Sequence, residues 1–367
     1  MYVKSLECAN YRNIEHEILQ PCQGVNLIYG ENAQGKTNLI ESIWLFTGCR
    51  SFRSTKDSEL IKFGEKKAIL NMDFYASERD QTAKIEIAEK RTFELNNIKK
   101  TSASRIMGEF ISVVFSPVHL NLIKGSPSER RKFIDIAISQ LKPKYAVTIS
   151  QYNKAIAQRN TVLKEINKKA SLYDTLDIWE ERIAFFASEI IKQRISYIKK
   201  LEQFCQEIYI GLSSGKEIIE VTYSQKNQYE NQENKQEIYE KIKIDLKNSR
   251  KVDLIYGSTS VGPHRDDLEI KINKLSAKIY GSQGQQRSAA LTLKLAEAAV
   301  IQDFSDEKPI ALLDDVMSEL DTNRQNYILN HIKDWQVFIS CCDPSTVQNL
   351  SYGKAFEVRE GQIVVSN

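Results

Sequence analysis

The octapeptide GENAQGKT, Gly30 to Thr37, constrains the fold of this chain more than any other stretch. It matches the pattern G-x-x-x-x-G-K-[ST] in full, follows the apolar run VNLIY and precedes the helical run KTNLIESIWLFTG. A strand, a glycine-rich loop and a helix in this order are typical of a phosphate-binding loop. We expect the nucleotide to be held by Gly30, Glu31, Asn32, Ala33, Gln34, Gly35, Lys36 and Thr37, with Lys36 on the β- and γ-phosphates and Thr37 on Mg²⁺.

A second run supplies the carboxylates that such a loop needs. The segment PIALLDD, residues 309–315, is an apolar strand that ends in two aspartates. We expect Asp314 to hold Mg²⁺, directly or through water, and Asp315 to orient or deprotonate the attacking water. An aspartate reaches about one methylene less far than a glutamate, so we expect slow hydrolysis.

A third stretch, YGSQGQQRSAALTLKLAEA at residues 280–298, predicts a second anion-binding site. The strand-like run KIY is followed by a glycine-containing turn and then by the N-terminus of a long helix, which can bind an anion. The order of phosphate loop, Ser-Gly-Gln turn and apolar-DD strand is that of ABC-type ATPase heads. Ser282, Gly284 and Gln285 form the turn, and SELD (318–321) fits the D-loop, with Ser318 and Asp321. We therefore expect an α/β fold: an ABC-type, SMC-like P-loop ATPase head.

The rest of the chain predicts a helical insertion in this head. With 367 residues, the chain suits two domains or one domain with a large insert. Strands are expected at 68–76, 83–97 and 110–116, a helix capped by Ser128 follows, and two long amphipathic helices reach about Ile208 across a polar connection at 167–174. Strands return at 217–225, then a polar helix at 226–250 and a strand-rich run at 253–280. The predicted domains are 1–115 (head), 116–215 (helical lobe) and 216–367 (head).

Composition indicates where in the cell the protein works and what kind of partner it could bind. No apolar run approaches the ~18 residues of a membrane span, and the N-terminus lacks a signal-peptide layout, so we expect a soluble, cytoplasmic protein with no membrane partner. Six cysteines without a C-x-x-C pair indicate reduced thiols. The net charge is only +3, but residues 120–200 hold 16 Lys and Arg against 8 Asp and Glu. This excess fits a surface for a polyanion, or equally the solvated faces of long helices.

The chain resembles the RecF family, bacterial recombination and gap-repair ATPases related to SMC-like heads. The resemblance rests on ANYRN (9–13), GENAQGKTNLIESI (30–43), GCRSFR (48–53), VFSP (114–117), LIKGSPSERRKFID (122–135), QRN and LK (158–164), GPHRDD (262–267), GSQGQQR (281–287) and LLDDVMSELD (312–321). It implies that ATP joins two copies head-to-tail, with Ser282 of one copy on the γ-phosphate held by Lys36 of the other. Lys36, Asp315 and Ser282 are then the catalytic residues of a weak DNA-dependent ATPase.

The resemblance also implies partners. These are double-stranded DNA and single-strand/duplex junctions, together with RecR and RecO, which promote RecA loading at gaps in a response linked to SOS. Such binding follows DNA structure, because no base-reading motif is present. The candidate phosphate contacts are Arg130, Arg131, Lys132, Lys142, Lys144, Lys199 and Lys200.

Two positions depart from transporter heads. Transporter heads carry a histidine after the strand that follows the carboxylate strand, whereas VFISCCD (337–343) of this chain has Ser340, Cys341, Cys342 and Asp343 there. Transporter heads also carry a glutamine near the position that Ser116 occupies in this chain. His264 either senses the γ-phosphate or stabilises the fold. The alternatives are an ABC transporter-type ATPase subunit, a break-repair SMC-like ATPase, a nuclease using Asp266 and Asp267, or a nucleotide-binding scaffold without DNA function.

Overall fold

The computed structural model describes residues 1–367 apart from 54–55, 167–169, 226–233, 306, 343–352 and 366–367. The chain divides into two compact units. The head unit contains Met1–Leu120, Glu207–Glu217 and Arg287–Asn367, and the lobe unit contains Asn121–Gln206 and Ile218–Gln286.

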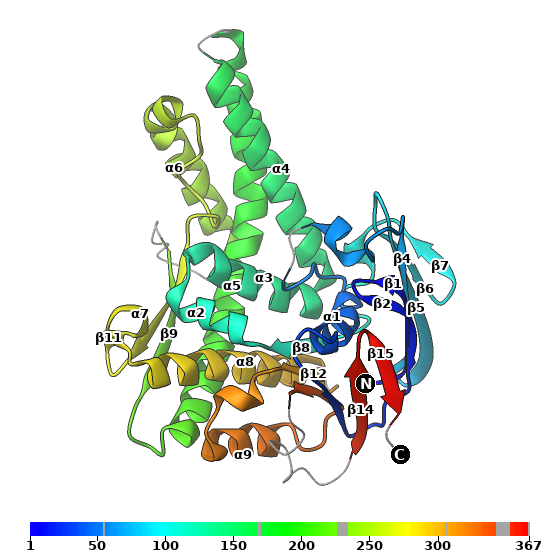
Figure 1. The fold of residues 1–367 in the computed structure, drawn as a ribbon. Coiled ribbons are helices and arrows are strands. Elements are labelled where there is room, and N and C mark those ends of the chain that lie inside the picture. The colour runs from blue at the N-terminus through cyan, green and yellow to red at the C-terminus, as the bar shows by residue number, and fades with distance from the viewer. Residues whose placement is uncertain (54–55, 167–169, 226–233, 306, 343–352, 366–367) are drawn as a thin grey trace. The chain divides into compact units, whose positions relative to one another are not determined.

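A mostly parallel sheet forms the centre of the head unit (Figure 1). Its strands, in spatial order, are β15 (Gln362–Val365), β14 (Gly353–Arg359), β3 (Val25–Tyr29), β13 (Val337–Cys341), β12 (Ile310–Asp314) and β8 (Ser112–Phe115). Every residue of β8, β12 and β13 is buried, as expected for strands covered on both faces. Helix α1 (Lys36–Leu45) packs on β8, β12 and β13 and also contacts β1 of the second sheet.

The second sheet of the head unit is antiparallel. Its order is β2 (Ile14–Leu19), β1 (Tyr2–Tyr11), β4 (Ala68–Ala76), β5 (Arg79–Ile87), β6 (Thr92–Leu95) and β7 (Ile98–Lys100). The single strand expected at 83–97 is wrong: the polar residues that follow Ile87 form a turn, and β6 folds back on β5. Helices α8 (Gln283–Ser305), which starts in the lobe unit, and α9 (Thr322–His331) flank β12 in sequence.

The lobe unit is mainly helical. It contains α2 (Asn121–Lys124), α3 (Pro127–Leu141), α4 (Pro143–Glu165), the greater part of α5 (Thr175–Leu212) and α6 (Lys235–Tyr256). The two long helices predicted from the apolar spacing are confirmed as α4 and α5, which run side by side in Figure 1. Part of their predicted connection, 167–169, lies outside the described residues, as do 226–233 of the predicted polar helix.

A small sheet completes the lobe unit: β9 (Ile219–Ser224) pairs with β10 (Asp267–Ile272), which pairs with β11 (Leu275–Ser276). Residues 218–286 therefore pack with the helices, although the sequence assigned them to the head. The predicted division into one head made of 1–115 and 216–367, with 116–215 as an inserted helical lobe, stays a prediction.

Three local expectations need correction. The KIY run is not a strand but the end of helix α7 (Ala277–Tyr280). Ser126, not Ser128, is the N-cap of α3, because Pro127 lacks an N–H and occupies the first helical position. Residues 253–256, expected as strand, are the last turn of α6, which ends at Gly257 in the left-handed conformation that glycine adopts readily.

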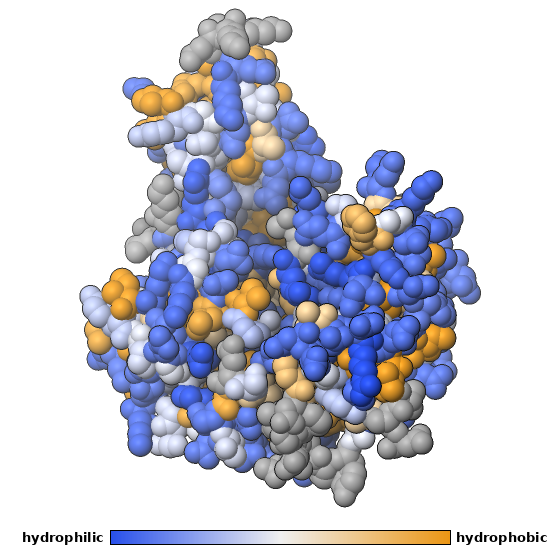
Figure 2. Space-filling model, viewed as in Figure 1, coloured by the Kyte–Doolittle hydropathy of each residue, from blue (hydrophilic) through white to orange (hydrophobic). Residues whose placement is uncertain are grey.

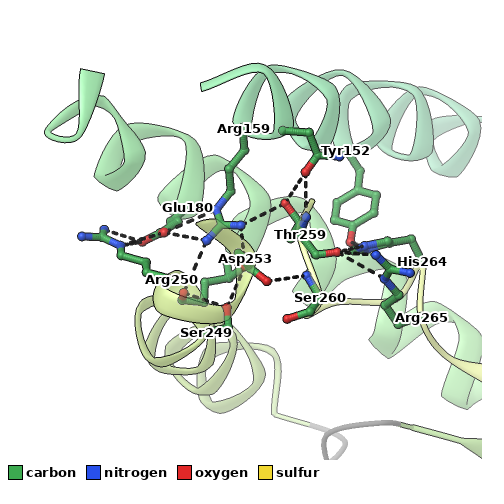
Figure 3. A network of polar contacts seen from close by, with 12 residues as sticks. Tyr152, Arg159, Glu180, Ser249, Arg250, Asp253, Thr259, Ser260, His264 and Arg265 are labelled. Atoms are coloured by element: carbon green, nitrogen blue, oxygen red, sulfur yellow. Dashed lines mark hydrogen bonds and ion pairs between the residues drawn. The ribbon is translucent and has the colours of Figure 1, made fainter. Parts of the chain in front are cut away.

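A buried charge network joins the helices of the lobe unit (Figure 3). Arg159 on α4 is fully buried and pairs with Glu180 on α5 at 3.0 Å and with Asp253 on α6 at 2.7 Å. Its guanidinium also donates to the Thr259 hydroxyl, and Arg250 donates to Glu180. Two arginines thus balance two carboxylates inside the unit, so that removing one partner leaves a buried charge without compensation.

His264 lies in the same region, and both of its ring nitrogens make hydrogen bonds (Figure 3). The Tyr152 hydroxyl lies 2.5 Å from Nδ1, and Nε2 lies 3.1 Å from the Thr259 carbonyl oxygen, which fits a neutral ring with its proton on Nε2. Burial lowers the pKa of His264 to about 4, and the positive charges of Arg265, Arg131 and Arg194 act in the same direction. These contacts support the fold-stabilising alternative for this histidine.

We predict that Arg159→Leu destabilises the protein by about 3–5 kcal/mol, because the buried Asp253 loses its ion-pair partner and Glu180 is left with Arg250 alone to balance it. Urea unfolding followed by circular dichroism measures this loss. The control is Arg182→Ala, an exposed arginine of α5 whose guanidinium lies 5.7 Å from the Trp179 ring centroid and whose removal should cost at most about 1 kcal/mol. A loss below that of the control would contradict the role given to Arg159.

His264 predicts a pH dependence of stability. Its pKa is lowered on folding, so between pH 6.5 and about 4 the unfolded chain binds the extra proton. Stability from this residue is complete above pH 6.5 and falls by up to about 3 kcal/mol towards pH 4. His264→Gln should show a flatter decline in the free energy of unfolding over this window. Parallel pH profiles of the two proteins would rule out the assigned contribution.

Candidate phosphate-binding site

The loop between β3 and α1 requires glycine at its two ends. Gly30 has a φ of 146°, and a Cβ there would lie 2.4 Å from the carbonyl oxygen of Val358. Gly35, the N-cap of α1, has a φ of 117°. Both values lie in the region that side chains disfavour, so the glycines of the motif let the chain turn into α1. The first N–H groups of α1 then face the loop, as an anion site requires.

Segments far apart in sequence brace this loop at Gln34. Its backbone carbonyl accepts hydrogen bonds from Gly361 N and Asn13 Nδ2, each at 2.9 Å. Its side-chain Oε1 accepts one from Glu360 N at 2.5 Å. The turn between β14 and β15 therefore fixes the middle of the loop, a contact that the motif itself does not reveal.

Lys36 is buried and turned back into the loop. Its Nζ donates to the carbonyl oxygens of Gly30 and Glu31, both at 2.7 Å, and lies 3.7 Å from Cys342 Sγ. The Cys342 thiol in turn lies 3.0 Å from Asn32 Oδ1. The ammonium group therefore sits inside the curve of the loop, where a phosphate would meet it.

Thr37 and Asp314 meet as the sequence predicted. The Thr37 hydroxyl donates to Asp314 Oδ1 at 2.7 Å, and the Ser340 hydroxyl donates to the same oxygen at 2.8 Å. Burial raises the pKa of the Asp314 carboxyl, and the two hydrogen bonds oppose that shift. A hydroxyl and a carboxylate are hard oxygen donors of the kind that Mg²⁺ prefers, so this pair fits the ion.

Asp315 has a left-handed backbone that Ser340 supports. Its φ of 52° is uncommon for residues other than glycine, asparagine and aspartate, and its N–H donates to Ser340 Oγ at 3.0 Å. Non-glycine residues in this conformation are found more often at functional sites. Ser340 thus contacts both aspartates, a role that sequence reasoning missed, although its position at the end of the adjacent parallel strand was the available signal.

A buried carboxylate on α1 itself was also missed. Glu41 is fully buried and accepts hydrogen bonds from Tyr11 at 2.8 Å, from Arg12 at 2.8 and 3.0 Å and from Ser51 at 2.5 Å. It therefore ties the ANYRN and GCRSFR motifs to the helix that carries Lys36. From the second motif, Arg53 Nη1 donates to Asn38 at 3.0 Å, and its charge lowers the pKa of Asp314 against the effect of burial.

The Ser-Gly-Gln turn lies in the lobe unit, at the start of α8. Ser282 N donates to Gln285 Oε1 at 2.8 Å, and Gln285 N donates to Ser282 Oγ at 3.2 Å. This reciprocal pair is a capping box. It fixes Ser282 at the helix start while using its hydroxyl oxygen only as an acceptor. Gly284 follows inside the first turn of α8.

The other predicted residues have varied surroundings. Ser318 in the D-loop donates to the Asp315 carbonyl at 3.1 Å, whereas Asp321 caps α9 through Arg324 N. Ser116 is buried and lines a small cavity of about 40 Å³ beside Val316. Cys341 is buried in β13, and Asp343 lies outside the described residues.

The candidate DNA contacts differ in exposure. Lys132, Lys144 and Lys199 are exposed, while Arg131, Lys142 and Lys200 are half-buried. Arg130 needs correction: its guanidinium is buried and makes two hydrogen bonds to Asp267, at 2.7 and 2.8 Å. Of the two aspartates offered for a nuclease, Asp266 accepts from the Tyr223 hydroxyl and Asp267 pairs with Arg130. Among the described residues no group of three or more His, Cys, Asp or Glu side chains is placed to hold a metal ion.

Within the described part of the chain, no helix is long and apolar enough to cross a membrane. Hydrophilic residues cover most of the face seen in Figure 2.

The loop, the carboxylate strand and the signature turn define an ABC-type P-loop ATPase head. The sequence profile of the RecF/RecN/SMC N terminal domain matches residues 2–363. DNA replication and repair protein RecF of Acetivibrio thermocellus is 40% identical over 361 residues, 98% of each chain, and that of Clostridium perfringens is 40% identical over 371 aligned residues, 99% of each. A solved structure of the recombination mediator protein RecF-ATPrS in the RecFOR pathway has a TM-score of 0.93 at 38% identity, covering 100% of this chain and 98% of that one.

The chain therefore belongs to the RecF/RecN/SMC N-terminal domain family and, within it, to the RecF group of DNA replication and repair proteins. This membership makes the head that of a repair ATPase rather than of a transporter subunit. The Smc head domain of Pyrococcus furiosus, at 18% identity and a TM-score of 0.56, shares the fold.

The left-handed backbone at Asp315 yields a prediction on stability alone. Asn adopts this conformation readily and Val does not, so Asp315→Val should lose about 1–2 kcal/mol more than Asp315→Asn. Urea unfolding without ligand measures the difference. Equal stabilities of the two variants would contradict a left-handed backbone at this position.

Proposed function

We propose that the protein is an ATP-gated DNA clamp for recombinational repair of gaps and for replication restart. ATP binding favours a head-to-tail homodimer, and slow hydrolysis releases it. The proposal rests on one observation above the others: an intact phosphate loop with Lys36 and Thr37 meets the Asp314 carboxylate in the head unit. It is supported by two solved structures at 38% identity, which are named RecF-ATPrS and RecF-ATP.

The nucleotide residues have distinct tasks in this proposal. The loop from Gly30 to Thr37 surrounds the phosphates, and Lys36 exchanges its contacts with loop carbonyls for phosphate oxygens. Thr37 and Asp314 hold Mg²⁺, which neutralises charge on the β- and γ-phosphate oxygens when bound. Asp315, fixed by Ser340, orients the attacking water, and its short reach keeps hydrolysis slow.

The signature turn acts on the partner copy. Ser282 is already ordered by its capping box, and its hydroxyl proton can point to the γ-phosphate held by Lys36 of the second copy. Next to the turn, Ile279 and Tyr280 are 71% and 68% exposed, an apolar surface that a second copy would cover. A ligand gripped by both copies only in the dimer must favour the dimer.

DNA is the proposed partner of the lobe unit. The exposed and half-buried Lys and Arg candidates, without Arg130, give contacts to phosphates of double-stranded DNA and of single-strand/duplex junctions, with a steep salt dependence. In this proposal DNA stimulates the weak ATPase. The protein works in the cytoplasm with RecR and RecO to promote RecA loading, linked to the SOS response, in line with the RecFOR pathway named for the solved relatives.

The test is the mass of the purified protein in solution with and without Mg-ATP. We expect a monomer alone and a dimer with nucleotide. Lys36→Met should lose nucleotide binding, because the cation inside the loop is gone, and stay monomeric. Ser282→Arg should bind nucleotide but stay monomeric, because the turn can no longer approach the partner's γ-phosphate.

The matched control is Ser171→Arg, which changes an exposed serine of the lobe unit outside the signature turn and should still dimerise. A wild-type protein that binds ATP and remains monomeric would refute the clamp mechanism for the isolated protein. A Ser282→Arg dimer would refute the composite site.

A further inference from the structure

Two neighbouring grooves on the lobe unit share one aromatic ridge. The first lies between α4 and α5 and has a volume of about 580 Å³, and the second lies between α5 and α6 with about 570 Å³. Phe185, Phe186 and Lys235 line both. Each volume falls in the range of about 300–1,000 Å³ that small-molecule ligands occupy in proteins.

The ridge between the grooves consists of Phe185 and Phe186, and Phe185 is its exposed ring. Phe185 is 54% exposed, although it stands on the long helix α5. Phe186 supports it edge-on, with ring centroids 5.4 Å apart and planes at 76°. Lys235 Nζ from α6 lies 5.0 Å from the Phe185 centroid. Phe185 therefore presents a large aromatic ring at the surface, with neighbours that contact it on two sides.

Positive charges surround this platform. Lys142 and Lys144 line the first groove, Arg182 lines the second, and Lys235 lines both. Against these four cations the grooves carry two carboxylates, Glu189, which pairs with Lys235 at 2.9 Å, and Glu181, which accepts from the Tyr239 hydroxyl at 3.3 Å. The grooves therefore offer an aromatic face within a net positive lining.

We propose that Phe185 stacks an unpaired base of DNA, while the cations of the two grooves contact the phosphates on either side of it. This inference rests on the proposed DNA-binding function and assigns the single-stranded part of a junction to these grooves. Duplex DNA presents phosphates but no exposed base face, so a basic surface alone would suffice for it. An exposed aromatic ring between cations is the arrangement that binds single strands.

The consequence is a preference for junctions over blunt duplex. Stacking of one base on an aromatic side chain corresponds to an affinity change of about 5- to 150-fold. Phe185→Ala should therefore bind a tailed duplex about 10-fold more weakly than the wild type does, while its affinity for blunt duplex stays within about twofold. Phe185→Trp should keep the preference, because tryptophan supplies a larger stacking face.

The experiment titrates full-length protein with Mg-ATP into two probes, a blunt duplex and the same duplex with a single-stranded tail that carries 2-aminopurine at its first unpaired position. We expect 2-aminopurine quenching with the wild type and Phe185→Trp, and its loss with Phe185→Ala. The control is Ile178→Ala, an apolar residue of α5 that is 60% exposed and does not line either groove. Thermal unfolding verifies that all variants are folded.

The outcomes separate this inference from the function on which it rests. If the wild type binds neither probe, the proposed DNA function fails. If the wild type binds both and Phe185→Ala keeps the quenching and the junction preference, the stacking site is overturned. If Phe185→Ala instead abolishes the ATP-dependent dimer with DNA binding intact, the ridge is an interface between copies, and the stacking site is again overturned.

Discussion

The nucleotide site of the head unit depends on the order of three parallel strands, because this order brings Thr37 within hydrogen-bonding distance of Asp314. The two residues are 277 positions apart, and they meet because β13 lies between β3 and β12 in register, with Tyr29 beside Cys341 and Ser340 beside Asp314. Carboxyl ends of parallel strands share one edge of a sheet, where ligand sites of open α/β folds lie. The same register puts the Ser340 hydroxyl between the two aspartates.

Both units bury charge in order to hold functional elements in place. Glu41 locks two loop motifs onto the helix of the phosphate site, and Arg159 joins three helices of the lobe. Desolvation offsets much of the attraction inside such a network, but the removal of one member leaves a buried charge and is costly. Surface residues such as Lys144, Arg182 and Phe185 then stand on helices α4 and α5, whose packing the Arg159 network fixes.

The sequence was most informative where a function depends on contiguous residues. The phosphate loop, the apolar-DD strand and the two long helices could be predicted because their patterns are local. Glu41 could not, since its partners Tyr11, Arg12 and Ser51 come from segments that only the fold brings together. For Ser340 the one signal was its place near the end of the strand adjacent to Asp314. Arg130 counted as a basic surface residue by composition, but Asp267 lies across from it and buries the charge. The N-cap of α3 is Ser126 and not Ser128, because Pro127 between them begins the helix.

The hydrogen bonds from the Glu360–Gly361 turn to Gln34 affect when the phosphate loop can form during synthesis of the protein. A growing chain exposes the phosphate loop early, but β12, β13, β14 and this turn all come from residues 310–361. A nascent chain that has reached only α8 lacks the carboxylate, the serine that positions it and the brace of the loop. Because such non-local contacts form late in folding, the head acquires its nucleotide site only after most of the polypeptide has left the ribosome.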